Sequence, residues 1–182
     1  MAELFYGSMR VPVTASWSAE EQFFLAPCPV FDGRLAICQN TAIGQGKALF
    51  GKPHAQRQRA ACGRALCDIC GRSLGPRTKV SLSHARPQPH GAEGWAILQV
   101  EPLMHRECAA IAIKLCPALK RDVEQGTLAV RQVFAWRAQV AIMAPDYVKS
   151  ITGTAVQALG HGKIELRKWR DRDLAWVERV AA

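Results

Sequence analysis

The sequence predicts an α+β protein in which a mainly β body carries a small metal-binding finger in its middle and ends in a helix. Three observations lead to this fold class. Short apolar and β-branched runs, separated by Pro and Gly, are typical of strands joined by turns. Two pairs of Cys or His residues with the spacing of metal ligands lie in the middle of the chain. Apolar residues recur at helical spacing after about residue 103 and again at the C-terminus.

The composition is that of an ordinary globular protein, with 49% hydrophobic and 21% charged residues in 182 positions. No run approaches the roughly 20 apolar residues of a membrane span, and the first residues lack the basic and apolar regions of an export signal. We therefore expect a cytoplasmic protein that is neither secreted nor inserted in a membrane. The seven cysteines favour metal ligation and burial over disulfides, which need an oxidising compartment and usually an even number.

The N-terminal part, residues 1–61, is expected to supply strands to the body. Its strand-like runs are separated by prolines and glycines, and a glycine-rich loop, residues 44–51, follows them. Pro53 then stands where a helix would begin, and the sequence after it is basic with little apolar periodicity. We expect this helix to lie on the surface. The predicted strands cover residues 10–15, 22–26 and 34–39, and the predicted helix covers residues 54–64.

The middle part, residues 62–120, contains the finger. The tight turn CDICGRSL is followed by two strand-like runs, residues 78–82 and 95–100, which we expect to form a β-hairpin. From about Leu103 the pattern is helical, and Pro117 ends the helix. The apolar face of this helix is formed by Ala109, Ala112, Ile113 and Cys116.

The C-terminal part, residues 121–182, is expected to add strands and a helix to the same body. Residues 128–143 predict one or two strands, and residues 153–163 are turn-rich. Asp171 or Asp173 is a candidate N-cap of the last helix. Because neither end of the chain has enough strands alone, we expect the early strands and residues 128–143 to pair across the finger. The buried face of the last helix would consist of Leu174, Val177 and Ala181.

Two pairs of possible metal ligands are the strongest chemical signal. Cys67 and Cys70 stand in a Cys-x-x-Cys-Gly turn, in which Gly71 permits the backbone conformation that brings both thiolates to one point. His105 and Cys108 are three residues apart at the start of the predicted helix and so share one of its faces. The helix N-terminus favours the thiolate form of a cysteine. Together the four residues make a closed Cys₃His set, which is typical of a structural Zn²⁺ site.

The order of these features resembles the treble-clef zinc fingers: a knuckle, two strands, and a helix whose first turn carries the second ligand pair. The resemblance covers residues 67 to about 116. Other residues are also chemically able to serve as ligands. Cys62 or Cys116 could replace a cysteine of the set, and His84 could replace His105. Cys28 and Cys38 are distant in sequence and are expected to be buried thiols.

The treble-clef frame is shared by the HNH nucleases, which place a catalytic His and a following Pro between the two ligand pairs. His84 and Pro87 stand at the corresponding places, so this resemblance would make His84 the residue that activates water beside a metal ion. However, Ser83 replaces the acidic metal ligand of that family, and Ala109 stands where Asn is common. These departures favour a finger without catalysis and leave the nuclease as an alternative.

Positive charge is concentrated before and on the finger. Residues 33–92 carry ten basic residues and one acidic residue, a net charge of +9, which equals that of the whole chain. Such a segment attracts polyanions. We therefore expect a non-enzymatic zinc-binding protein that binds nucleic acid or a nucleoprotein through phosphate contacts. The predicted contacts are Lys47, Lys52, Arg57, Arg59, Arg64, Arg72, Arg77 and Lys79, together with Trp169, an aromatic residue among basic neighbours.

A protein-interaction module is a further alternative. In that case the chain would be a regulator or inhibitor that docks on the acidic surface of a larger complex. Exposed Trp and Arg residues would make the contacts, because these types are enriched at the centres of protein interfaces.

Overall fold

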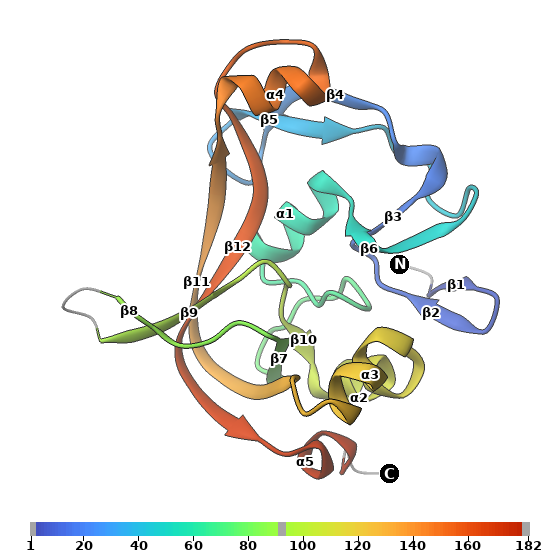
Figure 1. The fold of residues 1–182 in the computed structure, drawn as a ribbon, viewed down its shortest axis with the longest axis vertical. Helices are drawn as coiled ribbons and strands as arrows, with labels where there is room; N and C mark the ends of the chain where they lie inside the picture. Colours follow the sequence, from blue (N-terminus) through green and yellow to red (C-terminus); the bar gives the residue numbers. More distant parts are fainter. Residues whose placement is uncertain (1–2, 91–93, 180–182) are drawn as a thin grey trace.

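The computed structural model describes residues 3–90 and 94–179, and it is built around one curled sheet of eight strands (Figure 1). Two long antiparallel strands, β11 (Ala129–Met143) and β12 (Ala158–Arg172), form the spine of this sheet. Register shifts at three places in their ladder allow the pair to bend. With mostly strands and five α-helices among these described residues, the protein is of the mixed α+β class that the sequence predicts.

The sheet takes strands from all three parts of the chain. Along its main path the order is β10-β7-β11-β12-β5-β4, and β9 joins at β12 with β8 paired to β9. The early strands therefore enter the sheet through β12, where β5 runs parallel to it at Leu159 and Ala36, and not through residues 128–143. The bounds of these strands are β4 Phe23–Cys28, β5 Arg34–Gln39, β7 Lys79–Ser83, β8 Gln88–Pro89, β9 Trp95–Gln99 and β10 Met104–His105.

Two small sheets and a short 3-10 helix lie within the first 53 residues. The first pairs β1 (Leu4–Tyr6) with β2 (Met9–Val11). The second pairs β3 (Ala15–Trp17) with β6 (Ala48–Pro53), and η1 (Ser18–Glu20) follows β3. The expectation of a loop over residues 44–51 is therefore wrong for its last residues, which belong to β6.

The helix α1 (Ala55–Gly63) is buried against β12, contrary to the expected surface position. Its sequence has little apolar periodicity, yet its polar side chains are buried because they find backbone partners on the sheet. The side chain of Gln58 accepts a hydrogen bond from the N–H of Gly162 (2.7 Å) and donates to the carbonyl of the same residue (2.9 Å). Periodicity measures only the apolar part of burial, so it misses a helix held by hydrogen bonds.

The helices α2 (Arg106–Leu115), α3 (Pro117–Glu124) and α5 (Leu174–Glu178) surround the lower end of the sheet (Figure 1). Pro117 ends α2 as predicted. It also begins α3, because Pro suits the first turn of a helix, and this second helix was not predicted. Asp173 is the N-cap of α5, and Val177 is buried as expected. Ala181 lies outside the described residues. Within the described residues, none of the helices combines the length and apolar character that a membrane crossing requires.

The turn-rich interpretation of residues 153–163 holds for residues 153–157, which connect α4 to β12, and is wrong from Ala158 onward, where β12 begins. The two glycines in β12, Gly160 and Gly162, permit close packing instead of turns. A Cβ atom at Gly160 would lie 2.6 Å from the Met143 side chain, and one at Gly162 would lie 2.9 Å from Cβ of Cys62. The helix α4 (Pro145–Thr152), which precedes this stretch, was also missed.

The predicted hairpin between the knuckle and α2 is not formed as a single ladder. The strand β7 pairs with β10 and β11, whereas β9 pairs with β8 and β12. The curl of the sheet nevertheless brings the two strands together, because the hydroxyl of Ser81 donates to the side-chain oxygen of Gln99 at 2.6 Å. The order of knuckle, two strands and helix is thus present, but the strand pairing differs from the expectation.

Candidate metal centre

The first ligand pair lies in a tight turn between α1 and β7. The N–H of Cys67 donates to the carbonyl of Arg72, and the N–H of Gly71 donates back to the carbonyl of Cys67, both at 2.8 Å. Gly71 has a φ of 65°, in the left-handed region that side chains disfavour. This closed turn brings Cys67 and Cys70 together, as the Cys-x-x-Cys-Gly pattern predicts.

The second ligand pair comes from the start of α2. His105 is the last residue of β10 and the N-cap of α2, and Cys108 lies in the first turn of the helix. The pairing of His105 with Lys79 of β7 fixes the position of the helix start. A hydrogen bond from the N–H of Asp68 to the carbonyl of Leu103 (3.0 Å) ties the knuckle to the segment that leads into α2.

The ligand atoms of Cys67, Cys70, His105 and Cys108 all lie within 4.8 Å of one another. The Nδ1 atom of His105 is 3.4 Å from Sγ of Cys70 and 3.9 Å from Sγ of Cys108. Cys70 is half-buried, and the other three are buried. Three thiolates and one imidazole nitrogen are ligands that zinc prefers. The cluster could therefore hold a metal ion of this kind.

The ring of His105 is oriented by its other nitrogen, Nε2, which lies 3.0 Å from the carbonyl oxygen of Ser73. A carbonyl only accepts hydrogen bonds, so Nε2 carries the proton and Nδ1 presents a lone pair to the cysteine sulfurs. Metal-ligating histidines are usually held in this way by a second residue. The sequence analysis missed Ser73, because its contribution is a backbone carbonyl that any residue could supply.

The thiols of Cys67 and Cys108 have opposite pKa changes. The hydrogen bond from Cys108, with N–H groups of the knuckle and of His105, lowers the pKa of Cys67 to about 5 against the effect of burial. The same hydrogen bond, together with burial, raises the pKa of Cys108. Metal ligation needs the thiolate form, so metal binding would release the protons that these thiols hold.

The alternative ligands lie outside this cluster. Among the described residues, the four named above are the one group with ligand atoms gathered closely enough for a metal ion, and Cys62, Cys116 and His84 do not belong to it. Nε2 of His84 is instead 3.0 Å from a carboxylate oxygen of Asp122. His84 and Asp122 are not part of a group of three or more possible ligands among the described residues, and the nuclease alternative gains no support. Cys28 and Cys38 are buried thiols, as expected.

Arg57, a predicted phosphate contact, is bound within the protein. Its guanidinium donates to both oxygens of the buried Glu20 carboxylate, at 2.8 and 2.6 Å. The N–H groups of Trp17 and Ala42 donate to the same carboxylate, each at 2.9 Å. Burial raises the pKa of Glu20, but these hydrogen bonds outweigh it and lower the pKa to about 2. The guanidinium of Arg57 is therefore already paired with Glu20 inside the protein.

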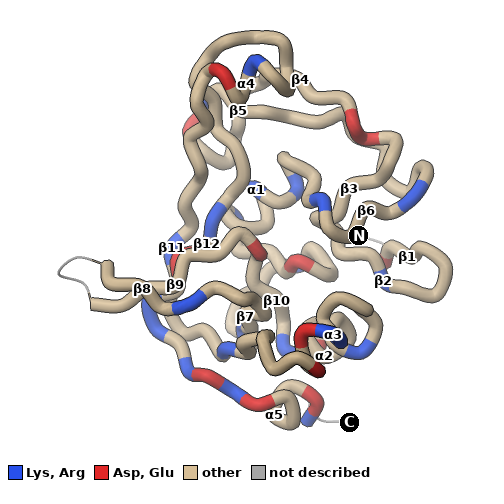
Figure 2. The backbone as a smooth tube through the Cα atoms, in the orientation of Figure 1, with Lys and Arg blue, Asp and Glu red and all other residues tan. Residues whose placement is uncertain are grey.

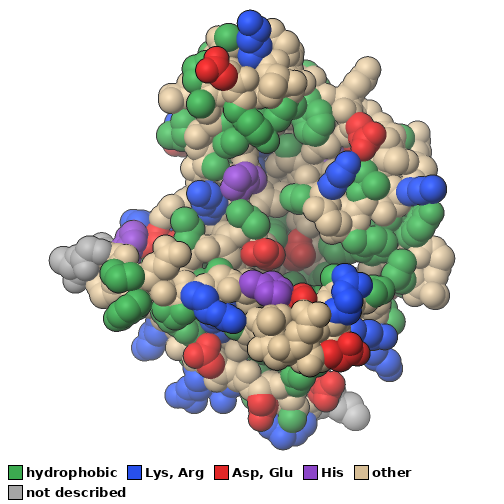
Figure 3. All heavy atoms as spheres, in the orientation of Figure 1, with side chains coloured by type: hydrophobic (Ala, Val, Ile, Leu, Met, Phe, Trp, Pro, Cys, Tyr) green, Lys and Arg blue, Asp and Glu red, His purple; other side chains and the backbone are tan. Residues whose placement is uncertain are grey.

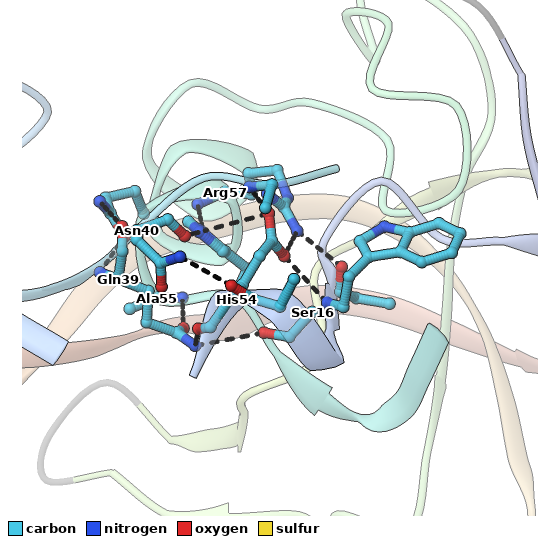
Figure 4. Close-up of polar contacts among 12 residues, drawn as sticks. Ser16, Gln39, Asn40, His54, Ala55 and Arg57 are labelled. Carbon is cyan, nitrogen blue, oxygen red and sulfur yellow. Dashed lines mark hydrogen bonds and ion pairs between the residues drawn. The ribbon is translucent and has the colours of Figure 1, made fainter. Parts of the chain in front are cut away.

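The surrounding polar groups converge on the start of α1 (Figure 4). The ring of His54 accepts a hydrogen bond from the N–H of Arg57 and so caps the helix. The side-chain oxygen of Gln39 accepts from the N–H of Ala55 at 2.7 Å, and the side-chain nitrogen of Asn40 donates to the carbonyl of Ala19 at 2.7 Å. This network joins α1 to the N-terminal strands and was not predicted.

Arg59, the next predicted phosphate contact, is a core residue with 1% exposure. It donates to the carbonyl of Gly160 at 2.9 Å, because the bend of the β11–β12 ladder leaves that carbonyl facing α1. The expectation that Arg59 contacts a polyanion is therefore wrong.

The remaining predicted contacts differ in position and exposure. Lys47, Lys52, Arg64, Arg72 and Arg77 are exposed, whereas Lys79 and Trp169 are half-buried. The ammonium of Lys79 lies 5.6 Å from the ring centre of Trp136, and Trp169 packs against the main core. The basic residues around β6 lie on the right of Figure 2, apart from those near β7, so the predicted contacts do not form one face.

Comparison of the chain with protein-family models, curated proteins and solved structures finds no match. The geometry of the Cys₃His cluster is therefore the main evidence on what the site can do.

Proposed function

We propose that Cys67, Cys70, His105 and Cys108 hold a structural Zn²⁺ ion in a treble-clef-like frame. Four nitrogen and sulfur ligands complete a tetrahedral site and leave no position for a substrate. The ion would join the knuckle to the start of α2, segments separated by 35 residues between Cys70 and His105. Zinc binding contributes about 10–16 kcal/mol in finger peptides, more than the whole stability of many domains. Its role here is to fold the finger.

We propose further that the protein binds nucleic acid through a basic rim around this centre, defined as Arg64, Arg72, Arg77 and Lys79. The observation that carries this proposal is the charge of the segment that holds the knuckle. Between Arg64 and Lys79 the single acidic residue is Asp68, and its carboxylate accepts a hydrogen bond from the hydroxyl of Thr14. The pair of Arg77 with Glu107 (2.9 Å) is exposed, so phosphate can compete for the guanidinium.

The rim contacts are expected to be phosphate contacts, which position a protein without reading base sequence. Binding should be measured by fluorescence anisotropy with labelled single-stranded DNA, duplex DNA and RNA of equal length, over a series of salt concentrations. Four phosphate contacts predict a slope of about −3 to −4 in a plot of log affinity against log salt for duplex DNA. A flat response, or no binding to any of the three, would overturn the proposal.

A matched pair of variants separates the rim from the overall positive charge. Arg72→Gln with Arg77→Gln removes two charges from the rim, and Lys47→Gln with Lys52→Gln removes two exposed charges near β6. The rim variant should weaken binding more and reduce the salt slope by about 2. Equal effects of the two variants would show that net charge, and not the rim, attracts the nucleic acid.

A further inference from the structure

A long cleft runs across the face of the molecule shown in Figure 3. It consists of three adjoining hollows with volumes of about 330, 280 and 590 Å³, bounded by α2–α3 at one end and α4 at the other. The first two hollows share Phe50, Asp68 and Glu101 in their walls, and the last two share Gly51 and Gln58. The shared walls make the three hollows one continuous cleft.

Both ends of the cleft are apolar. The end beside the metal centre is formed by α2, α3 and the hairpin β1–β2, and the other end is formed by α4 with β4, β5 and β6. At the α4 end Lys52 pairs with Glu21 at 3.5 Å, so the charges there compensate each other. The apolar residues of the first end include Met9, Phe50, Ile111, Leu115 and Leu119, and those of the second include Phe23, Ile37, Leu49, Met143, Tyr147 and Ile151.

The middle of the cleft is acidic, because Asp68 and Glu101 line both hollows that meet there. Figure 3 shows acidic side chains inside the hollow, with hydrophobic side chains around it. Arg10, in the same wall, pairs with Glu3 at 2.7 Å. In the part of the chain that the structure describes, neither Asp68 nor Glu101 forms an ion pair with a basic residue. Burial raises the pKa of Asp68 above its usual range, so a cation in the cleft would meet mainly the negative charge of Glu101, with the oxygens of Asp68 as further acceptors.

The wall of the cleft also contains backbone that lies outside a β-ladder. The strand β6 pairs with β3 through Ala48, Leu49 and Pro53, so the backbone between Leu49 and Pro53 leaves that ladder. Gly51 lies in this segment and lines two of the three hollows. A Cβ atom at Gly51 would meet nothing within 4 Å, which shows that the space in front of this backbone is open. An extended chain could hydrogen-bond here as a strand bonds to a sheet edge.

We propose that this cleft binds an extended segment of a partner protein in which a Lys or Arg side chain is flanked by apolar residues. The cationic side chain would lie between Asp68 and Glu101, and the apolar side chains would fill the two ends. The elongated, continuous shape and the open backbone favour an extended peptide over a compact ligand. Nucleic acid does not fit here, because its phosphates would face the acidic side chains of Asp68 and Glu101. The proposal is independent of the basic rim.

The test is a display selection with random peptides of about eight residues on the folded, zinc-loaded chain. Peptides enriched on the wild-type protein should contain Lys or Arg between apolar positions. The strongest peptide should lose at least tenfold in affinity when its basic residue is replaced by the isosteric, uncharged citrulline or by norleucine. Enrichment of peptides without a basic residue, or no enrichment at all, would overturn the proposal.

Two variants locate the binding. Glu101→Arg reverses the charge at this exposed position and should abolish the preference for a basic peptide. Gly51→Leu should block the cleft for basic and uncharged peptides alike. The open space around Gly51 gives the leucine side chain room without disturbing the fold. Zinc content, melting temperature and nucleic-acid binding should remain unchanged in both variants. Wild-type affinity in both variants would contradict the proposal.

Two other occupants are distinguished by the same variants. Self-association that Gly51→Leu abolishes, measured by sedimentation, would assign the cleft to a second copy of this chain. Binding of a small apolar amine, phenethylamine, as tightly as the selected peptides would assign the cleft to a compact ligand. Either result would overturn the assignment to a partner segment.

Discussion

His105 presents its Nδ1 atom to the cysteine sulfurs because Nε2, on the other side of the ring, is hydrogen-bonded to the carbonyl oxygen of Ser73 at 3.0 Å. The contact connects the helix that supplies the second ligand pair to the end of the knuckle that supplies the first. It fixes the tautomer before any metal ion binds, so the imidazole needs no reorientation.

This relationship predicts the protonation of His105 in solution. In the zinc-loaded protein the ring should be the Nε2–H tautomer, with an unprotonated, metal-shifted Nδ1. A long-range ¹H–¹⁵N correlation spectrum distinguishes the two tautomers. A spectrum of the Nδ1–H form would contradict both the hydrogen bond to Ser73 and the ligation through Nδ1.

The metal centre predicts a severe effect of removing one ligand. Cys67→Ser should lose zinc and give protein that is insoluble or rapidly digested by protease, because the hydrogen bonds between the knuckle and the start of α2 stabilise the finger far less than zinc binding would. Zinc content by mass spectrometry and limited proteolysis measure this. Cys116→Ser is the matched control, since Cys116 lies outside the cluster, and it should retain full zinc. A Cys67→Ser protein with unchanged melting temperature would refute a structural role.

The ion pair of Glu20 and Arg57 predicts an acid-sensitive contribution to stability. The pKa of Glu20 falls from 4.5 to about 2 on folding. A lowered pKa stabilises the fold above pH 4.5, and this contribution is lost as the pH falls toward 2. It corresponds to about 3 kcal/mol at neutral pH.

Denaturant unfolding of wild type and Glu20→Gln at several pH values tests this contribution. The variant should be less stable by about 3 kcal/mol at pH 7, and the difference should shrink between pH 4.5 and 2. Glu21→Gln, at an exposed pair with Lys52, is the control and should change stability by less than about 0.5 kcal/mol. A difference for Glu20→Gln that does not vary with pH would contradict the assigned pKa.

The burial of Arg59 predicts that this arginine stabilises the fold and takes no part in binding. Arg59→Met should lower the free energy of unfolding by about 1–3 kcal/mol, because the buried carbonyl of Gly160 loses its donor. At a temperature where the variant is folded, its affinity for nucleic acid should equal that of wild type. Arg64→Met, at an exposed position, should weaken nucleic-acid binding and leave the free energy of unfolding unchanged. Weakened binding by folded Arg59→Met would restore Arg59 to the binding surface.

Local patterns predicted much of the secondary structure. The strand over residues 34–39 and the cap at Asp173 depend on neighbours in sequence, and the structure agrees with both. The glycines at 160 and 162 were misinterpreted because the residues they approach, Met143 and Cys62, are distant in sequence. The helix α1 was misplaced for a related reason, since the partners of Gln58 lie on β12.

For the site, the sequence alone predicted the four candidate ligands, because the Cys-x-x-Cys-Gly turn and the His-x-x-Cys helix start each favour a local geometry. Only the tertiary structure decided that the two pairs meet, since their separation depends on how β10 pairs with β7. It also separated the basic residues of the middle segment into a buried arginine, an internal ion pair and side chains that are exposed or half-buried. Charge can be counted along a chain, but its availability to a partner depends on which side chains the fold surrounds.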